Sequence, residues 1–225
     1  SIYHDVDLVN AIPAISVQRI RQLGICSEEE IAPLQSYVNE RERWFQELMA
    51  LHGVNRETAK NMVIAVSYGG CIANQLKEHA WTSKDRSTDD LERLERCMRT
   101  VREKVVRHYK MRVDSRGQRS DFSLITQGWE DEVLVCMVAW LESAGWKVGS
   151  LEFDGFHVEH RDDQVLGTAI CRCEKHVREK LGISIRLKEK DLYGLQDSSD
   201  LLGDLSAETP APSLGFDAEK VTSAL

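Results

Sequence analysis

Three aspartates lie in two segments whose local patterns place carboxylates at accessible positions. Asp5 and Asp7 fall in YHDVDLVNAIP at 3–13, a strand-like run in which alternate side chains share one side. Asp154 begins an Asp-Gly pair flanked by alternating apolar residues, the preferred sequence for a two-residue hairpin turn. Carboxylates from separate segments can hold two divalent metal ions about 4 Å apart, as phosphoryl transfer requires. We therefore expect Asp5, alone or with Asp7, to share two Mg²⁺ ions with Asp154.

A second pattern places two cations and an aromatic residue along one helix. In RETAKNMVIAVSYGG at 56–70, Arg56, Lys60, Ile64 and Tyr68 recur every four residues. Each step of four turns about 40° past a full helical revolution, so the four side chains form one slowly drifting stripe roughly 18 Å long. Two cations followed by an aromatic ring suit a triphosphate with a base beyond it.

The charge of the chain is unevenly distributed. The net charge is −8, but the segment from Gln196 to Leu225 holds six acids and one lysine. Between Arg93 and Arg119, ten Lys or Arg residues accompany only three acids. Such a basic segment is typical of a contact with a phosphate backbone, although a solvated helix face is the ordinary alternative. The candidate nucleic-acid contacts in this segment are Arg99, Arg102 and Arg107.

These motifs resemble, in order and spacing, those of the family A DNA polymerases and, more loosely, of single-subunit phage-type RNA polymerases. The resemblance covers roughly residues 1–194. Motif A is nearest the D-V-D form of mitochondrial-type members, which makes Asp5 the expected metal ligand and Asp7 its neighbour. Motif B, R-x3-K-x7-Y-G, matches at every spacing and ends at Tyr68-Gly69, and motif C contributes Asp154. A further match is TQGWEDEVLVCMVAWLESAGW at 126–146, where Gln127 and Glu132 hold the places of a Q-G-x-x-x-D/E helix that leads into motif C.

The resemblance implies a metal-dependent nucleotidyltransferase that extends a DNA primer–template with deoxynucleoside triphosphates. Asp5 and Asp154 would hold the two Mg²⁺ ions. Arg56 and Lys60 would clamp the phosphates, with Lys60 at the reacting centre. The remaining expected contacts are made by Tyr68, which would stack near the incoming base, and Gln127, which would touch the minor groove of the nascent pair.

The chain also departs from the family. Asn10 stands where the family has a Glu that blocks the ribose 2′-hydroxyl, and Ile64 stands where it has Phe or Tyr. Motif C reads F-D-G instead of H-D-E, so Phe153 and Gly155 replace residues that assist the primer terminus and metals. Two alternatives therefore stay open: a catalytically inactive, polymerase-like nucleic-acid-binding module, and an RNA polymerase or primase-like enzyme. Because the sequence begins at motif A, we expect a thumb or exonuclease segment upstream or in a partner.

Taken singly, each motif has an ordinary structural interpretation. An Asp-Gly hairpin is usually only a turn, an Asp-x-Asp strand is commonly a surface edge, and an Arg-x3-Lys helix is ordinarily a solvated face. Their conjunction, with the Gln127 helix directly before the hairpin, favours the polymerase interpretation over coincidence.

The elements expected around these motifs predict an α+β fold, a polymerase palm with a small antiparallel sheet plus helical fingers and no thumb. Ser27 and Glu30 form a capping-box pattern that predicts a helix to about Leu51, closed by Gly53. Further helices are predicted from about Ser87 to Val113, at 127–145 and at 164–181, with a loop at 114–121 and a last strand at 183–188. The expected divisions are a motif A palm segment (1–25), fingers and basic helix (26–120), palm with motif C (121–194) and a disordered acidic tail (195–225).

Composition sets the expected environment. No apolar run approaches the ~20 residues of a membrane span, and the N-terminus lacks a charged-then-apolar signal region. The six cysteines lack paired zinc spacing, which favours free thiols in a reducing compartment. The sequence thus predicts a soluble intracellular protein without a membrane partner, and leaves nucleus or organelle open.

Overall fold

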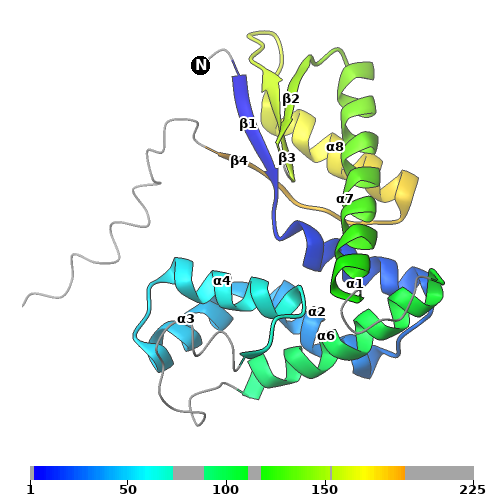
Figure 1. The fold of residues 1–225 in the computed structure, drawn as a ribbon. Helices are drawn as coiled ribbons and strands as arrows, with labels where there is room; N and C mark the ends of the chain where they lie inside the picture. The colour runs from blue at the N-terminus through cyan, green and yellow to red at the C-terminus, as the bar shows by residue number, and fades with distance from the viewer. Residues whose placement is uncertain (1–2, 73–88, 111–117, 153, 191–225) are drawn as a thin grey trace, which may run out of the picture. The chain divides into compact units, whose positions relative to one another are not determined.

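The sheet that carries the aspartates is small and antiparallel (Figure 1). The computed structural model describes residues 3–72, 89–110, 118–152 and 154–190. Within them the strand order is β2-β3-β1-β4, built from β1 (Tyr3–Leu8), β2 (Val148–Glu152), β3 (Gly155–Glu159) and β4 (Leu187–Lys190). The predicted sheet of motif A strand, motif C hairpin and C-terminal strand is therefore confirmed as an arrangement of strands.

The two faces of the sheet differ in chemistry because strand side chains alternate. Val6 lies opposite Phe156 in the β1–β3 pair, and both are buried on the helix-covered face. On the other face, Asp5 lies opposite Lys190 in the β1–β4 pair, and Asp7 lies opposite Lys188. Carboxylates of β1 and ammonium groups of β4 therefore lie side by side on this polar face.

Helices make up most of the described chain, which is α+β as predicted. Seven helices lie within the described residues: α1 (Ala11–Leu23), α2 (Glu28–Asn39), α3 (Arg41–His52), α4 (Arg56–Ser67), α6 (Asp89–His108), α7 (Gln118–Ser143) and α8 (Leu166–Leu181). Figure 1 shows α7 and α8 beside the sheet. The capping box of Ser27 with Glu30 is confirmed, as are left-handed glycines that end helices at Gly53 and Gly182.

The helix predicted from Ser27 to Leu51 is wrong as a single element. It is broken at Glu40, which has φ −124° and ψ 32° and separates α2 from α3. The break turns the chain so that Trp44 and Phe45 pack on Tyr37, with ring centroids 5.6 and 6.3 Å apart. Burial of three aromatic rings outweighs the one helical turn that is lost.

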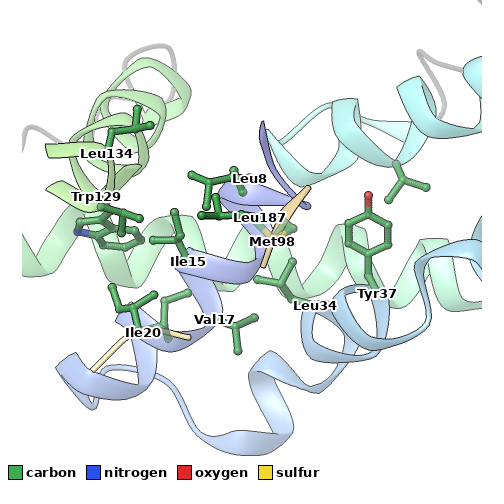
Figure 2. Packing of buried hydrophobic residues seen from close by; sticks show 14 of the residues in the cluster. Leu8, Ile15, Val17, Ile20, Leu34, Tyr37, Met98, Trp129, Leu134 and Leu187 are labelled. Atoms are coloured by element: carbon green, nitrogen blue, oxygen red, sulfur yellow. The ribbon is translucent and has the colours of Figure 1, made fainter. Parts of the chain in front are cut away.

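Helix α1 was not predicted, yet it occupies the centre of the core. Figure 2 shows Ile15 and Ile20 of α1 facing Trp129, and Leu8 beside Leu187 from the strands next to it. These residues are at most 7% exposed. Since α1 follows β1 directly, its packing fixes the strand that carries Asp5 and Asp7.

Two further boundaries differ from the prediction. Helix α7 begins at Gln118, within the segment predicted as a loop and nine residues before the predicted start. The last strand pairs with β1 only from Leu187, because the Gln18 side chain accepts from Ser184 N (2.7 Å) and donates to Ser184 O (2.8 Å). Gln18 thus takes the place of a neighbouring strand there.

Other predictions fall partly outside the described residues. Helix α6 covers most of the predicted basic helix, but the predicted end of that helix at Val113 lies outside the described residues. Phe153 and the predicted tail at 195–225 also lie outside the described residues. Residues Ser1–Lys190 form one compact unit, and the proposed division at 120/121 falls inside α7.

In the part of the chain that the structure describes, no helix has the length and apolar character needed to cross a membrane. All six cysteines are free thiols.

Candidate active site

A pocket of about 680 Å³ lies between the polar face of the sheet, which carries Asp7, and residues of α4 and α7. Its lining combines charged groups of both signs with a few aromatic and amide side chains. The acids are Asp7, Glu130 and Asp154, the cations are Arg41, Lys60, Lys188 and Lys190, and the others that matter here are Asn10, Tyr37, Ile64, Tyr68 and Gln127. Residues from the four sequence motifs thus line one cavity.

Asp7 and Asp154 meet because of the strand register. Asp7 lies opposite Gly155, the residue after Asp154, and Leu8 N donates to Asp154 O at 3.1 Å. A side chain at Gly155 would collide with the Asp7 carboxylate, so this close approach requires glycine. Burial raises the pKa of Asp154, the charge of Asp7 adds to the shift, and Lys190 and Lys60 oppose it. The two carboxylates therefore share one electrostatic environment.

Asp5 is placed differently from the expectation that it is the main metal ligand. It lies opposite His157 in the β1–β3 register, two pairs away from the Asp7–Gly155 pair, and its Oδ1 is 3.7 Å from His157 Nε2. Asp5 is not among the pocket-lining residues, whereas Asp7 is. The register therefore favours Asp7 as the partner of Asp154.

The motif B helix presents only part of its stripe to the pocket. Lys60, Ile64 and Tyr68 line the pocket, but Arg56 does not. Arg56 Nη2 donates to Glu42 Oε1 at 2.5 Å, and its guanidinium lies 5.3 Å from the Phe45 ring centroid. The reason is the drift of a four-residue repeat, which accumulates to roughly 120° over three steps.

Arg41 was missed by sequence reasoning and takes part in the site. It is the first residue of α3, lines the pocket beside the buried Tyr37, and lies 5.2 Å from the Phe45 ring centroid. Its Nε is buried and has no hydrogen-bond partner among the described residues. No sequence signal identified Arg41, because only the break at Glu40 turns it inward.

Asn10 and Gln127 both line the pocket. Asn10 has φ 56°, a left-handed conformation that asparagine tolerates better than most residues, and it turns the chain from β1 into α1. Its buried Nδ2 has no hydrogen-bond partner within the described residues, so a donor is available to a ligand. Gln127 is exposed at the pocket edge, while Glu132 is turned away and pairs with Arg19.

Glu130 is the second residue that the sequence did not single out. Burial raises the pKa of Glu130 to about 7, and the charges of Asp154 and Asp131 add to the shift. A carboxyl group with a pKa near neutrality in a cleft is a frequent property of functional sites. Its position one helical turn after Gln127 could have identified Glu130 from the sequence as a residue on the same face of α7.

The raised pKa of Glu130 predicts a pH-dependent effect on stability. Because the pKa of Glu130 in the folded protein lies above its unfolded value of 4.5, the folded state favours the protonated acid. The stability that protonated Glu130 contributes is fully present below pH 4.5 and is lost as the pH rises through about 7. Glu130→Gln, which stays neutral, should therefore gain stability relative to the wild type between pH 5 and pH 8. Urea unfolding at several pH values measures the gain, and a difference independent of pH would contradict the shift.

The basic helix α6 uses one of its predicted nucleic-acid residues to support the pocket. The Arg102 guanidinium packs directly on Gly69, at φ 89°, beside the pocket residue Tyr68. Lys104, also in this segment, pairs with Glu30 of α2 at 2.6 Å. Arg99 and Arg107 are exposed, so they remain candidates for a backbone contact.

Gly69 should therefore resist substitution. A Cβ at Gly69 would both adopt a strained left-handed conformation and displace Arg102, so Gly69→Ala should lower the free energy of unfolding by about 1–3 kcal/mol. Gly128→Ala is the control, since a Cβ there meets nothing within 4 Å inside α7, and it should raise stability by about 0.5–1 kcal/mol. Equal effects in denaturant unfolding would refute the role of Arg102.

The donor set suits a hard divalent cation. Asp7 and Asp154 offer carboxylate oxygens from separate strands, which is the ligand type that Mg²⁺ prefers, with remaining positions left to water and phosphate. Among the described residues, no group of three or more His, Cys, Asp or Glu side chains is arranged to hold a metal by itself.

No protein-family model matches the chain. The chain is 22% identical over 197 residues to a protein of Sputnik virophage described as "Putative helicase V13". The match covers 84% of this chain and 24% of that protein, so the chain spans about a quarter of the length of this relative. At this identity the match indicates a distant relationship without fixing an activity.

Proposed function

We propose that this chain is the palm-and-fingers part of a template-directed DNA polymerase, a nucleotidyltransferase that joins a deoxynucleotide to a primer 3′-hydroxyl. One observation carries the proposal. Motifs A, B and C and the Gln127 helix, which span residues 5 to 154, contribute side chains to the same 680 Å³ pocket. Independent surface features have no reason to converge in this way.

Each part of the pocket has a role in the proposal. Lys60 and Arg41 bind the triphosphate as cations, with Arg41 in the role first expected of Arg56. Tyr68, exposed at the end of α4, offers a ring to the incoming base. Asp7 and Asp154 hold Mg²⁺, which when bound activates the attacking hydroxyl and neutralises the leaving pyrophosphate.

The primer–template has two proposed contacts. Gln127, exposed at the pocket edge, has the donor and acceptor groups needed to contact the minor groove of the newly formed pair. Arg99 and Arg107 on the exposed side of α6 follow the phosphate backbone without reading sequence.

Nucleotide binding tests this proposal most simply. A non-hydrolysable deoxynucleoside triphosphate, titrated with Mg²⁺ into the full-length protein by calorimetry, should bind, and Arg41→Ala should weaken the binding by about 10-fold through loss of a charge-assisted contact. Arg43→Ala, a neighbouring arginine held by Glu40, Glu47 and Asp90, is the control and should bind as the wild type does. Absence of nucleotide binding, or equal effects of both substitutions, would refute the assignment.

A second candidate is a nucleic-acid-binding module without catalysis. It is favoured by Gly155 in place of an acid and by the ion pair of Lys190 with Asp7, which both reduce the negative charge available to metals. The virophage relative, whose name describes it as a helicase, fits either candidate as part of a larger protein. Nucleic-acid binding without triphosphate binding would favour this second candidate.

Asn10 and Ile64 predict weak discrimination between sugars. Asn is shorter than the Glu it replaces in the family and offers a hydrogen-bond donor, and aliphatic Ile64 adds no aromatic wall. The ratio of kcat/KM for deoxynucleotide over ribonucleotide should therefore be below about 10⁴ on one primer–template. A higher ratio would show that another residue excludes the 2′-hydroxyl, and a clear preference for ribonucleotides would favour the RNA polymerase or primase alternative.

A further inference from the structure

Lys190 lies among the carboxylates of the proposed metal site. It is the last residue of β4, lies opposite Asp5 in the β1–β4 register, and its Nζ forms an ion pair with Asp7 Oδ2. Asp7 is largely buried, with 18% of its side chain exposed, whereas Lys190 is 55% exposed. The partly exposed ammonium group can therefore regain hydration when it leaves the ion pair, while the largely buried Asp7 carboxylate must keep a positive partner.

We propose that Lys190 is a positioning residue that occupies Asp7 in the absence of substrate and competes with divalent cations for it. The inference rests on the proposed function, because it takes Asp7 and Asp154 as the metal pair. A divalent ion that reaches Asp7 must break the ion pair and approach a nearby ammonium charge. An anionic triphosphate in the same pocket offers Lys190 a new partner, so substrate binding releases Asp7.

The consequence is a low metal affinity in the free protein. Lys190→Met keeps the length of the side chain and removes its charge, and should tighten Mn²⁺ binding by about 10-fold, whereas Lys190→Arg should leave the affinity near that of the wild type. Lys188→Met is the matched control, since Lys188 lines the same pocket from the same strand, opposite Asp7. Its effect should be clearly smaller, because the ion pair to Asp7 is made by Lys190.

The experiment measures free Mn²⁺ by electron paramagnetic resonance during titration of the full-length protein without nucleotide or DNA. Unchanged or weaker Mn²⁺ binding in Lys190→Met, or an equal gain in Lys188→Met, would overturn the inference. Each titration is repeated with Asp154→Asn. If Asp154→Asn abolishes Mn²⁺ binding in the wild type but Lys190→Met has no effect, only the role of Lys190 fails. If neither the wild type nor any Lys190 or Lys188 variant binds Mn²⁺ in a way that depends on Asp154, both the role of Lys190 and the proposed metal pair of Asp7 and Asp154 are refuted.

Discussion

Asp154→Asn should lower the rate of nucleotide incorporation by about 10³-fold or more, while binding of the primer–template stays near the wild-type level. Asn keeps the shape of Asp154 but lacks the charge that a divalent metal needs. Asp7→Asn should have a comparable effect, because Asp7 lines the pocket and its charge acts on Asp154. Single-turnover extension, with DNA affinity measured in parallel, separates the chemical step from binding.

Asp5→Asn is the matched control for these two substitutions. Asp5 shares a strand and a face with Asp7, yet it lies opposite His157 outside the pocket. We expect Asp5→Asn to reduce incorporation by less than about 10-fold. The reverse order, with Asp5 essential and Asp7 dispensable, would mean that the motif A comparison identified the metal ligand correctly and the register did not.

Lys60→Ala should lower kcat/KM for the nucleotide by roughly 10- to 100-fold. Lys60 lies in the pocket on α4, where it can make a charge-assisted contact with a phosphate, worth about 1.5–3 kcal/mol. Steady-state extension at varied nucleotide concentration gives the value, and an unchanged melting temperature confirms that folding is intact.

Arg56→Ala provides the comparison on the same helix. Because Arg56 pairs with Glu42 and lies over Phe45, its removal should change stability slightly and kcat/KM by no more than a few-fold. A loss at Arg56 equal to that at Lys60 would place the phosphates near the start of α4, against the observed geometry.

Local patterns predicted the parts of the fold that local forces decide. The capping box of Ser27 and Glu30 fixes the start of α2, because it depends on residues three positions apart. Asp154 lies in the turn between β2 and β3 as predicted, but Gly155 is the first residue of β3 and pairs with Glu152, so the expected Asp-Gly two-residue turn is wrong in its position. The break at Glu40 was missed because it accompanies the packing of Trp44 and Phe45 on Tyr37, and the spacing of these aromatic residues does not by itself show where the helix breaks.

In the candidate site, too, local spacing predicted some residues, and contacts between distant segments decided the others. The sequence identified Asp7, Lys60 and Tyr68 as candidates, because spacing within an element shows which side chains share a face. It could not select Asp7 over Asp5, since the choice depends on a pairing register between segments about 150 residues apart in the chain. Arg41 and Lys190 reach the pocket only through the α2–α3 turn and the β1–β4 pairing, which sequence patterns leave undetermined.

Template-directed incorporation of a single nucleotide tests the central claim most directly. The full-length protein is mixed with Mg²⁺, the four deoxynucleoside triphosphates supplied one at a time, and four primer–templates that differ only in the templating base. The pocket predicts that the complementary nucleotide is added on each template and that Asp154→Asn removes every product. Absence of any product from the wild-type protein on all four templates, or products that do not follow the templating base, would contradict the account.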